Sequence, residues 1–124
     1  MHYSGSIQFS IVARSSDEVA AEMPITAGIL NPYGTVHAGA TLWFADVTAT
    51  TLVLEGKDAS KGMKGFPLAI NLSANLAGNQ SDGVFLATAR YVKRGKTVSI
   101  VRTTVSGKDG RLIADVTTSH VASN

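Results

Sequence analysis

Residues 31–56 read NPYGTVHAGATLWFADVTATTLVLEG, and this stretch decides the fold. It opens with three turn-forming residues, Asn31, Pro32 and Gly34. Between residues 38 and 54 the only charged side chain is Asp46, and Gly56 then supplies a helix stop. We therefore predict one long helix over residues 38–54 that is apolar nearly all round and buried on most of its surface.

Two alternatives to a buried helix are a membrane span and a β-strand. The run is nearly long enough to cross a bilayer. However, threonines dilute it, and Asp46 lies at its middle, where a carboxylate costs roughly 2.5–3.5 kcal/mol. Threonine also favours strands. The spacing nevertheless fits a helical face better than an alternating strand, at Ala40, Trp43, Phe44, Val47, Thr51 and Leu54.

Length and composition limit the possible classes of protein. A chain of 124 residues suits one domain with one core, so we predict a single domain over residues 1–124. A hydrophobic content of 44% indicates a globular chain. The net charge of +2 suits a polyanionic small ligand but lacks the basic stripe of a nucleic-acid binder. No cysteine is present, which excludes disulfides and thiolate chemistry. No targeting signal is visible, so the default location is the cytoplasm.

Strand patterns flank the helix on both sides. Residues 7–13 alternate between apolar and polar or smaller side chains, and residues 18–26 predict a second strand that completes an amino-terminal hairpin. Four β-rich stretches follow the helix, at residues 67–77, 84–93, 97–106 and 111–121. Two hairpin signals separate the later ones, Arg94-Gly95 and Asp109-Gly110.

The stretch 67–77 has the cleanest alternation, and it places one set of residues on a single face: Leu68, Ile70, Leu72, Ala74 and Leu76. A helix that is apolar all round needs a sheet curved about it. We therefore predict an α+β fold in which one long central helix is wrapped by a meandering antiparallel sheet. Because the helix covers one face of the sheet, the other face must meet solvent or another subunit.

Asp46 is the first candidate for chemistry. A carboxylate inside an apolar helix is costly unless it has a partner or serves a reaction. In the structural interpretation Asp46 caps a loop or pairs with an arginine in the core. In the functional interpretation burial raises the pKa of Asp46 towards the range of a general base or nucleophile. The pattern leaves both open.

The start of the helix is the second candidate. His37 either orders the preceding turn or marks an anion site, because unpaired N–H groups and the helix dipole favour negative charge there. In the second case the N–H groups of Ala38 and Gly39 hold the oxyanion of an acyl-transfer intermediate. Asn31 either orients water or ties down its own loop before Pro32.

The two candidates are too far apart to act together within one chain. Eight residues separate Ala38 from Asp46, which is about 12 Å along a helix axis. If both act on one carbonyl, Asp46 must come from a second helix that lies antiparallel about a two-fold axis. On that condition, the sequence predicts two equivalent sites at a homodimer interface.

Basic residues crowd the hinge after residue 89, at Arg90, Lys93, Arg94, Lys96 and Arg102. They form either a solvated hairpin or a seat for a nucleotide or pantetheine phosphate. Gly95-Lys96-Thr97 is not a phosphate-binding P-loop, because the required earlier glycine is replaced by Arg90. The three histidines lack metal-ligand spacing, so we expect no metal.

The pattern Asn31-x-x-Gly34-x-x-His37-x-Gly39, with Asp46 nine residues beyond His37, resembles the hotdog-fold acyl-CoA thioesterases of the phenylacetate-pathway type. Three later features occur in family-like order: the strand 68–76, the Arg94-Gly95 hairpin and the turn and strand 109–114. The resemblance implies a dimer that often assembles into a homotetramer, and hydrolysis of a small acyl- or aryl-CoA thioester. Coenzyme A is then part of the substrate, with no separate cofactor, no nucleic acid and no membrane partner.

By position, the resemblance implies that Asp46 is the general base or nucleophile and that the Ala38 N–H of the other subunit is the oxyanion donor. His37 then shapes the loop and polarises the thioester carbonyl, and Asn31 positions water or substrate. The chain departs from the family twice. Ala38 stands where a glycine is usual, and Ala69 stands where some members carry a serine or threonine.

Other functions on the same scaffold stay open. One is a non-catalytic acyl-CoA binding module, which the missing hydroxyl at Ala69 motivates. Another is a hydratase or dehydratase. The acyl group is also open, because four aromatic residues either line a pocket or pack in the core: Trp43, Phe44, Tyr33 and Phe66.

Overall fold

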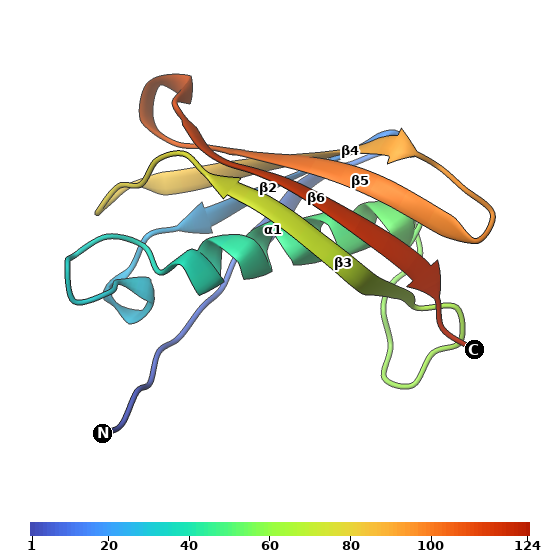
Figure 1. Ribbon diagram of the computed structural model, residues 1–124, viewed down its shortest axis with the longest axis horizontal. Coiled ribbons are helices and arrows are strands. Elements are labelled where there is room, and N and C mark those ends of the chain that lie inside the picture. The colour runs from blue at the N-terminus through green and yellow to red at the C-terminus, as the bar shows by residue number, and fades with distance from the viewer.

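The computed structural model describes residues 1–124 as one six-stranded antiparallel sheet and one long helix. The sheet curves over the helix α1 (Ala38–Val53), as Figure 1 shows. The strands are β1 (Ser10–Arg14), β2 (Glu18–Pro24), β3 (Pro67–Leu76), β4 (Val84–Lys93), β5 (Val98–Ser106) and β6 (Leu112–Ala122). The predicted α+β class, with one central helix wrapped by a curved antiparallel sheet, is confirmed.

Helix α1 ends one residue before the predicted boundary. Its threonines fit an apolar helix because their hydroxyls bond to the preceding turn: Thr48 donates to the Phe44 carbonyl (2.7 Å) and Thr51 to the Val47 carbonyl (2.8 Å). The side that faces the sheet is buried, but Trp43 on the opposite side is 38% exposed. The chain by itself therefore does not cover the helix all round. No helix is long and apolar enough to cross a membrane.

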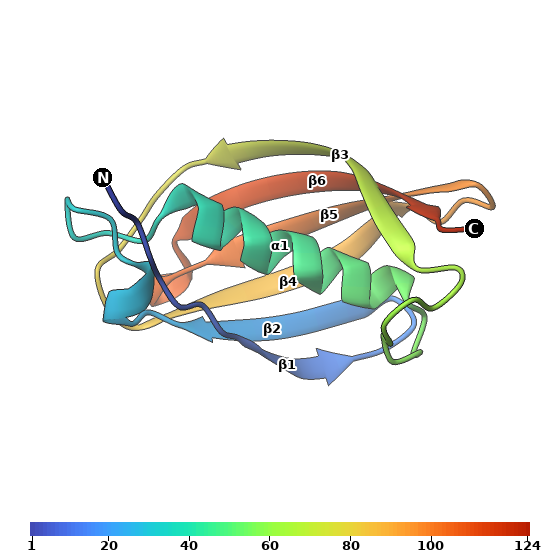
Figure 2. The same ribbon diagram turned by 90° about the horizontal axis from the view of Figure 1, so that it is seen from below.

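The strand order is β1-β2-β4-β5-β6-β3. The predicted amino-terminal hairpin (β1 and β2) is present, and β4, β5 and β6 form a meander. The predicted meander does not extend to β3. Both edges of β4 are occupied, by β2 and β5, so β3 pairs with the free edge of β6 (Figure 2).

The predicted alternation of β3 breaks at Ile70, where the register against β6 shifts. A bulge of this kind changes which side chains face the helix. Ala69 lies opposite the buried His120 and so belongs to the helix side, whereas its neighbour Leu68 belongs to the outer face. The prediction that Leu68 shares one face with Leu72 is therefore wrong.

The first strand begins later than predicted, at Ser10 instead of Ile7. The preceding residues pass over the start of α1 and then run beside the helix to β1 (Figure 2). Phe9 packs edge-on against Trp43 and Phe44, with ring centroids 5.0 Å apart in each pair. Phe9 is therefore held by aromatic contacts with the helix and not by strand pairing in the sheet.

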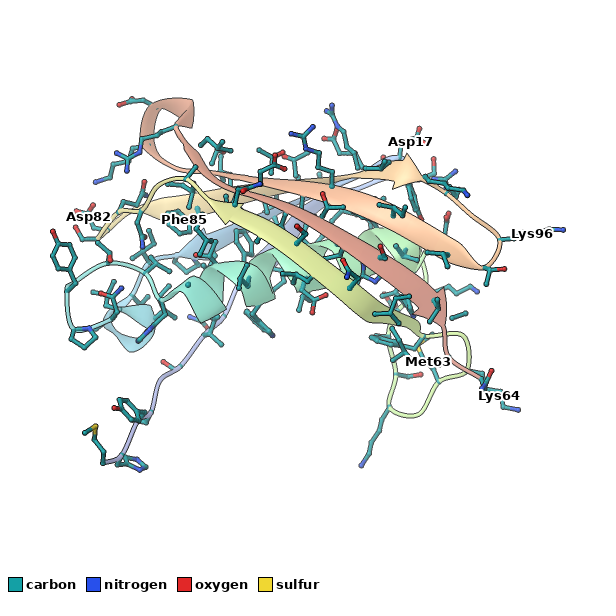
Figure 3. The ribbon with its side chains drawn as sticks, viewed as in Figure 1. Asp17, Met63, Lys64, Asp82, Phe85 and Lys96 are labelled. Carbon is teal, nitrogen blue, oxygen red and sulfur yellow. The ribbon has the colours of Figure 1, made fainter.

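The core lies between α1 and the sheet. Phe44 of the helix and Phe85 of β4 are fully buried in one cluster, and Figure 3 shows Phe85 pointing from the sheet towards the helix. Small residues on the same helix face, such as Ala45 and Ala49, let the helix pack closely against the strands. This packing fixes the position of both ends of the helix, and therefore of the candidate site.

Candidate active site

The start of α1 presents free backbone donors. His37 is the N-cap residue, and its carbonyl accepts the N–H groups of Ala40 (3.0 Å) and Thr41 (3.2 Å). The N–H groups of Ala38 and Gly39 have no hydrogen-bond partner in the chain, and both residues are exposed. A Cβ built at Gly39 would meet no atom within 4 Å. The helix start can therefore receive an anionic or polarised oxygen.

The loop before the helix is held together by Asn31. Its Oδ1 accepts the N–H groups of Gly34 and Thr35, both at 3.1 Å, and its Nδ2 donates to the Thr35 hydroxyl (3.0 Å). Both ends of the carboxamide are thus engaged within the loop. Of the two interpretations that the sequence leaves open for Asn31, these contacts support the loop-tying one.

A second asparagine, which the sequence pattern does not single out, anchors this loop to the rest of the protein. Asn79, in the turn after β3, accepts the Val36 N–H at Oδ1 (3.2 Å) and donates from Nδ2 to the Val36 carbonyl (2.8 Å). Its side chain thereby imitates a strand partner two residues before the helix. The contact spans 43 positions in sequence, so no local pattern reveals it.

Replacing Asn79 by alanine should lower the free energy of unfolding by about 1–3 kcal/mol, because two part-buried backbone groups at Val36 lose their partners. Chemical denaturation measures this loss. Asn124→Ala is the control, since Asn124 is exposed and lies beyond the end of β6. Equal stability of the two variants would contradict the anchoring role of Asn79.

Asp46 lies on α1, half-buried, with no salt bridge. Its Oδ1 is buried and has no hydrogen-bond partner. Burial raises the pKa of Asp46, and the nearby His120 opposes this rise. The structural interpretation, a core ion pair with an arginine, therefore finds no partner. The carboxylate faces a cavity of about 250 Å³ between the helix and β3. The lining includes Thr50, Phe66 and Ala69.

His120 is the second titratable group near this cavity. It is 1% exposed, lies on β6 opposite Ala69, and its Nε2 is 2.8 Å from the Thr118 hydroxyl. Burial lowers the pKa of His120, which keeps the imidazole neutral near pH 7, whereas the Pro67 carbonyl and Asp46 act in the opposite direction. The signal in the sequence is the alternation of residues 112–122, which places His120 on the same face as Thr118.

Three other side chains could supply the hydroxyl that is missing at Ala69, namely Thr48, Thr50 and Ser73. Thr48 is buried and bonds to its own helix. Ser73 pairs with Thr117 on the outer face of the sheet. Only Thr50 lines the cavity beside Asp46. A hydroxyl is therefore present near the carboxylate, although it comes from the helix.

The predicted basic residues divide between two places: Arg90 and Arg102 line a depression of about 400 Å³ on the sheet, and Arg94 and Lys96 lie at the β4–β5 hairpin. Arg90 lies on the outer face and bonds to Glu18 (2.7 Å), and Lys93 ends β4 without an ion pair. Arg94 stacks on Tyr91, 4.4 Å from the ring centroid, and pairs with Glu55 (3.2 Å). Figure 3 shows Lys96 extending from the tip of the β4–β5 hairpin. Arg94 and Lys96 share a cavity of about 190 Å³ beside the end of α1.

No three histidine, aspartate or glutamate side chains lie together in a group that could hold a metal ion. The arrangement instead offers backbone N–H donors at one point of the helix and a partnerless carboxylate at another. Together they suit chemistry at a carbonyl, provided that a second chain brings them together.

The sequence matches no family model, and a search among curated proteins gives no match. Solved structures do match. A thioesterase enzyme from Staphylococcus aureus, studied as a variant with one glutamine replaced by alanine, is 23% identical, with a TM-score of 0.85 over 94% of this chain and 93% of that chain. A hypothetical thioesterase from Streptococcus pneumoniae with coenzyme A is 17% identical, with a TM-score of 0.82 over 94% and 87%.

A third solved structure is a Streptococcus mutans protein bound to acetyl CoA, which is 19% identical, with a TM-score of 0.83 over 94% of this chain and 90% of that chain. These likenesses establish the architecture: one long helix packed against a six-stranded antiparallel sheet, which is the hotdog fold of thioesterases. The fold expected from the resemblance is thus confirmed.

Proposed function

We propose that this protein is an acyl-CoA thioesterase that hydrolyses a small acyl- or aryl-CoA thioester to the free acid and coenzyme A. The observation that carries this proposal is the half-buried carboxylate of Asp46, whose buried Oδ1 has no hydrogen-bond partner and which lines a cavity beside the helix. The solved structures with coenzyme A and acetyl CoA on the same fold support the choice of substrate class.

In the proposed reaction the carbonyl oxygen of the thioester accepts hydrogen bonds from the N–H groups of Ala38 and Gly39 at the start of one helix, beside His37. The ionised Asp46 of the second subunit removes a proton from water, whose oxygen attacks the carbonyl carbon. The carbon–sulfur bond then breaks, its electron pair goes to sulfur, and Asp46 returns the proton to the departing thiolate. Alternatively, Asp46 attacks directly and water hydrolyses the resulting anhydride.

The second subunit would dock on β3. This strand is an edge of the sheet, and its large apolar side chains are exposed: Leu68 46%, Ile70 58%, Leu72 41% and Leu76 52%. An unpaired edge that is also apolar is typical of a strand that pairs with another chain. Two β3 strands that pair about a two-fold axis would place their helices antiparallel, as the distance argument requires.

Ile70→Lys should convert the dimer into monomers and abolish most of the hydrolysis, because a charge at the exposed edge opposes strand pairing. Sedimentation velocity measures the change in mass. Val92→Lys is the control, since Val92 is 62% exposed on β4, away from this edge. A variant at Ile70 that stays dimeric and active would show that the subunits meet elsewhere.

A screen of short, long and aromatic CoA thioesters, with the released thiol followed by a thiol reagent, tests the activity itself. Hydrolysis of any of them supports the proposal. The second candidate, a non-catalytic acyl-CoA binding module, is favoured by the missing hydroxyl at Ala69 and predicts tight binding without thiol release. For the phosphates of coenzyme A, we propose Arg94 with Lys96, because these two share a cavity.

A further inference from the structure

A cavity of about 420 Å³ lies at the start of α1, and no pattern in the sequence indicates it. One wall is the amino-terminal segment where it passes the start of the helix (Figure 2). The other walls come from the first turns of α1 and from the turn that contains Gly28. The segment contributes Tyr3, Ser4, Gly5, Ser6 and Ile7, and the helix contributes Gly39, Ala40 and Trp43.

The course of the segment is fixed on both sides of this cavity. At one side the Ser6 N–H donates to the Gly28 carbonyl (3.2 Å). A Cβ at Gly5 would lie 2.7 Å from that carbonyl oxygen, so only glycine fits at this crossing. At the other side Phe9 packs edge-on against Trp43. The segment is thus held against the helix by a backbone bond and an aromatic contact.

The chemistry of the walls selects an apolar occupant. Trp43, Ile7 and Ile29 supply apolar surface, and apart from His37 the lining contains no titratable group other than the Tyr3 phenol. The cavity also touches His37 and Gly39, at the helix start where the N–H groups are free. A carbonyl held there would have an apolar cavity directly beside it, on the same subunit.

We propose that residues 3–7 and Trp43 form the acyl-binding pocket and that they determine which acyl groups the protein accepts. The pocket is near the small end of the usual range for ligand sites, roughly 300–1,000 Å³. It therefore suits a compact apolar acyl group, such as an aromatic ring or a medium-length aliphatic chain, and excludes a charged one. The placement of the carbonyl rests on the proposed thioesterase function.

Trp43 is the single tryptophan of the chain, so its fluorescence reports occupation of this pocket directly. We would titrate Asp46→Asn protein, which holds substrate without turnover, with benzoyl-CoA, acetyl-CoA and coenzyme A. Benzoyl-CoA should change the emission strongly, and coenzyme A should not. If the wild-type protein hydrolyses benzoyl-CoA but the emission of Trp43 does not change on binding, the pocket assignment fails and the thioesterase proposal stands. If Trp43 responds but no CoA thioester is hydrolysed, the pocket assignment stands and the thioesterase proposal fails.

Variants of the segment test its role in specificity. Ile7→Ala enlarges the pocket and should shift the ratio of kcat/KM values for decanoyl-CoA over benzoyl-CoA upwards by about tenfold, whereas Ser4→Phe fills it and should shift the ratio downwards. Both residues are exposed enough to change without loss of the fold. Val12→Ala, an exposed apolar residue on β1 outside the pocket, is the control. Ratios equal to that of the control would overturn the assignment.

Discussion

Replacing Asp46 by asparagine should reduce thioester hydrolysis by about 10²–10⁴-fold, because the amide can neither accept the proton of water nor attack the carbonyl. Steady-state release of coenzyme A measures this loss. In the wild type, burial raises the pKa of Asp46, so the acid limb of the kcat/KM profile, which reports the free enzyme, should lie above the pKa of an ordinary carboxyl group. A variant with wild-type turnover would remove Asp46 from the mechanism.

The same variant should be at least as stable as the wild type near pH 7.5. A carboxyl group whose pKa is raised by folding contributes stability below its unfolded pKa and loses it as pH rises through the folded pKa. At pH 7.5 the wild type therefore bears the cost of a buried charge that asparagine lacks, and near pH 3 the difference should vanish. Thermal unfolding at both pH values measures this effect.

Asp115 is the matched control for stability. Arg102 holds the pKa of Asp115 below its usual value through paired contacts of 2.7 and 2.9 Å. Asp115→Asn should therefore change stability in the opposite direction at neutral pH, although only slightly, because Arg102 is largely exposed and solvent screens the pair. If Asp46→Asn instead unfolds at a lower temperature than the wild type, then Asp46 has a structural partner, and its role as a free base is wrong.

Two inactive variants should restore activity when they are mixed. Ala38→Pro removes one proposed oxyanion donor and should cost about 10²–10³-fold in kcat. Proline is tolerated at the first position of a helix, and the preceding His37 already has the extended conformation that proline requires (φ −56°, ψ 134°). The fold should therefore survive, and circular dichroism checks this.

Refolding equal amounts of Ala38→Pro and Asp46→Asn together gives mixed dimers in about half of the molecules. If each site takes Asp46 from one subunit and the Ala38 N–H from the other, a mixed dimer holds one intact site and one with both defects. Activity should then return to about one quarter of the wild-type value. If both residues act within one subunit, no site is intact and the mixture stays inactive. Each variant refolded alone, which gives dimers of two identical chains, serves as the control.

The secondary structure was largely predictable because it depends on local periodicity. The helical spacing from Ala40 to Leu54 and the turn pairs near Arg94 and Asp109 are local signals, and each element lies close to its predicted range. The position of β3 was not predictable in this way. Its place depends on which strand edges remain free after β4 has paired with both β2 and β5, which is a property of the whole sheet.

The candidate site likewise contains residues that local sequence indicates and residues that only the fold reveals. Residue type and spacing identified Asp46 and the helix start, because a lone charge and a capping position stand out in an apolar run. Asn79 and His120 act through contacts across 43 and 53 positions, and nothing near them in sequence indicates those contacts. The bulge at Ile70 could not be predicted either. The alternation of side chains along β3 looks regular until the pairing with the partner strand is known.

The exposed edge of β3 has a consequence for how the protein works at different concentrations. If hydrolysis needs two chains joined along that edge, then turnover per molecule must fall on dilution, and at low abundance the total activity must vary with the square of the amount of protein present. A newly synthesised chain would also be idle until it meets another. The amount of protein made would thus set not only how many active molecules exist but whether any are active at all.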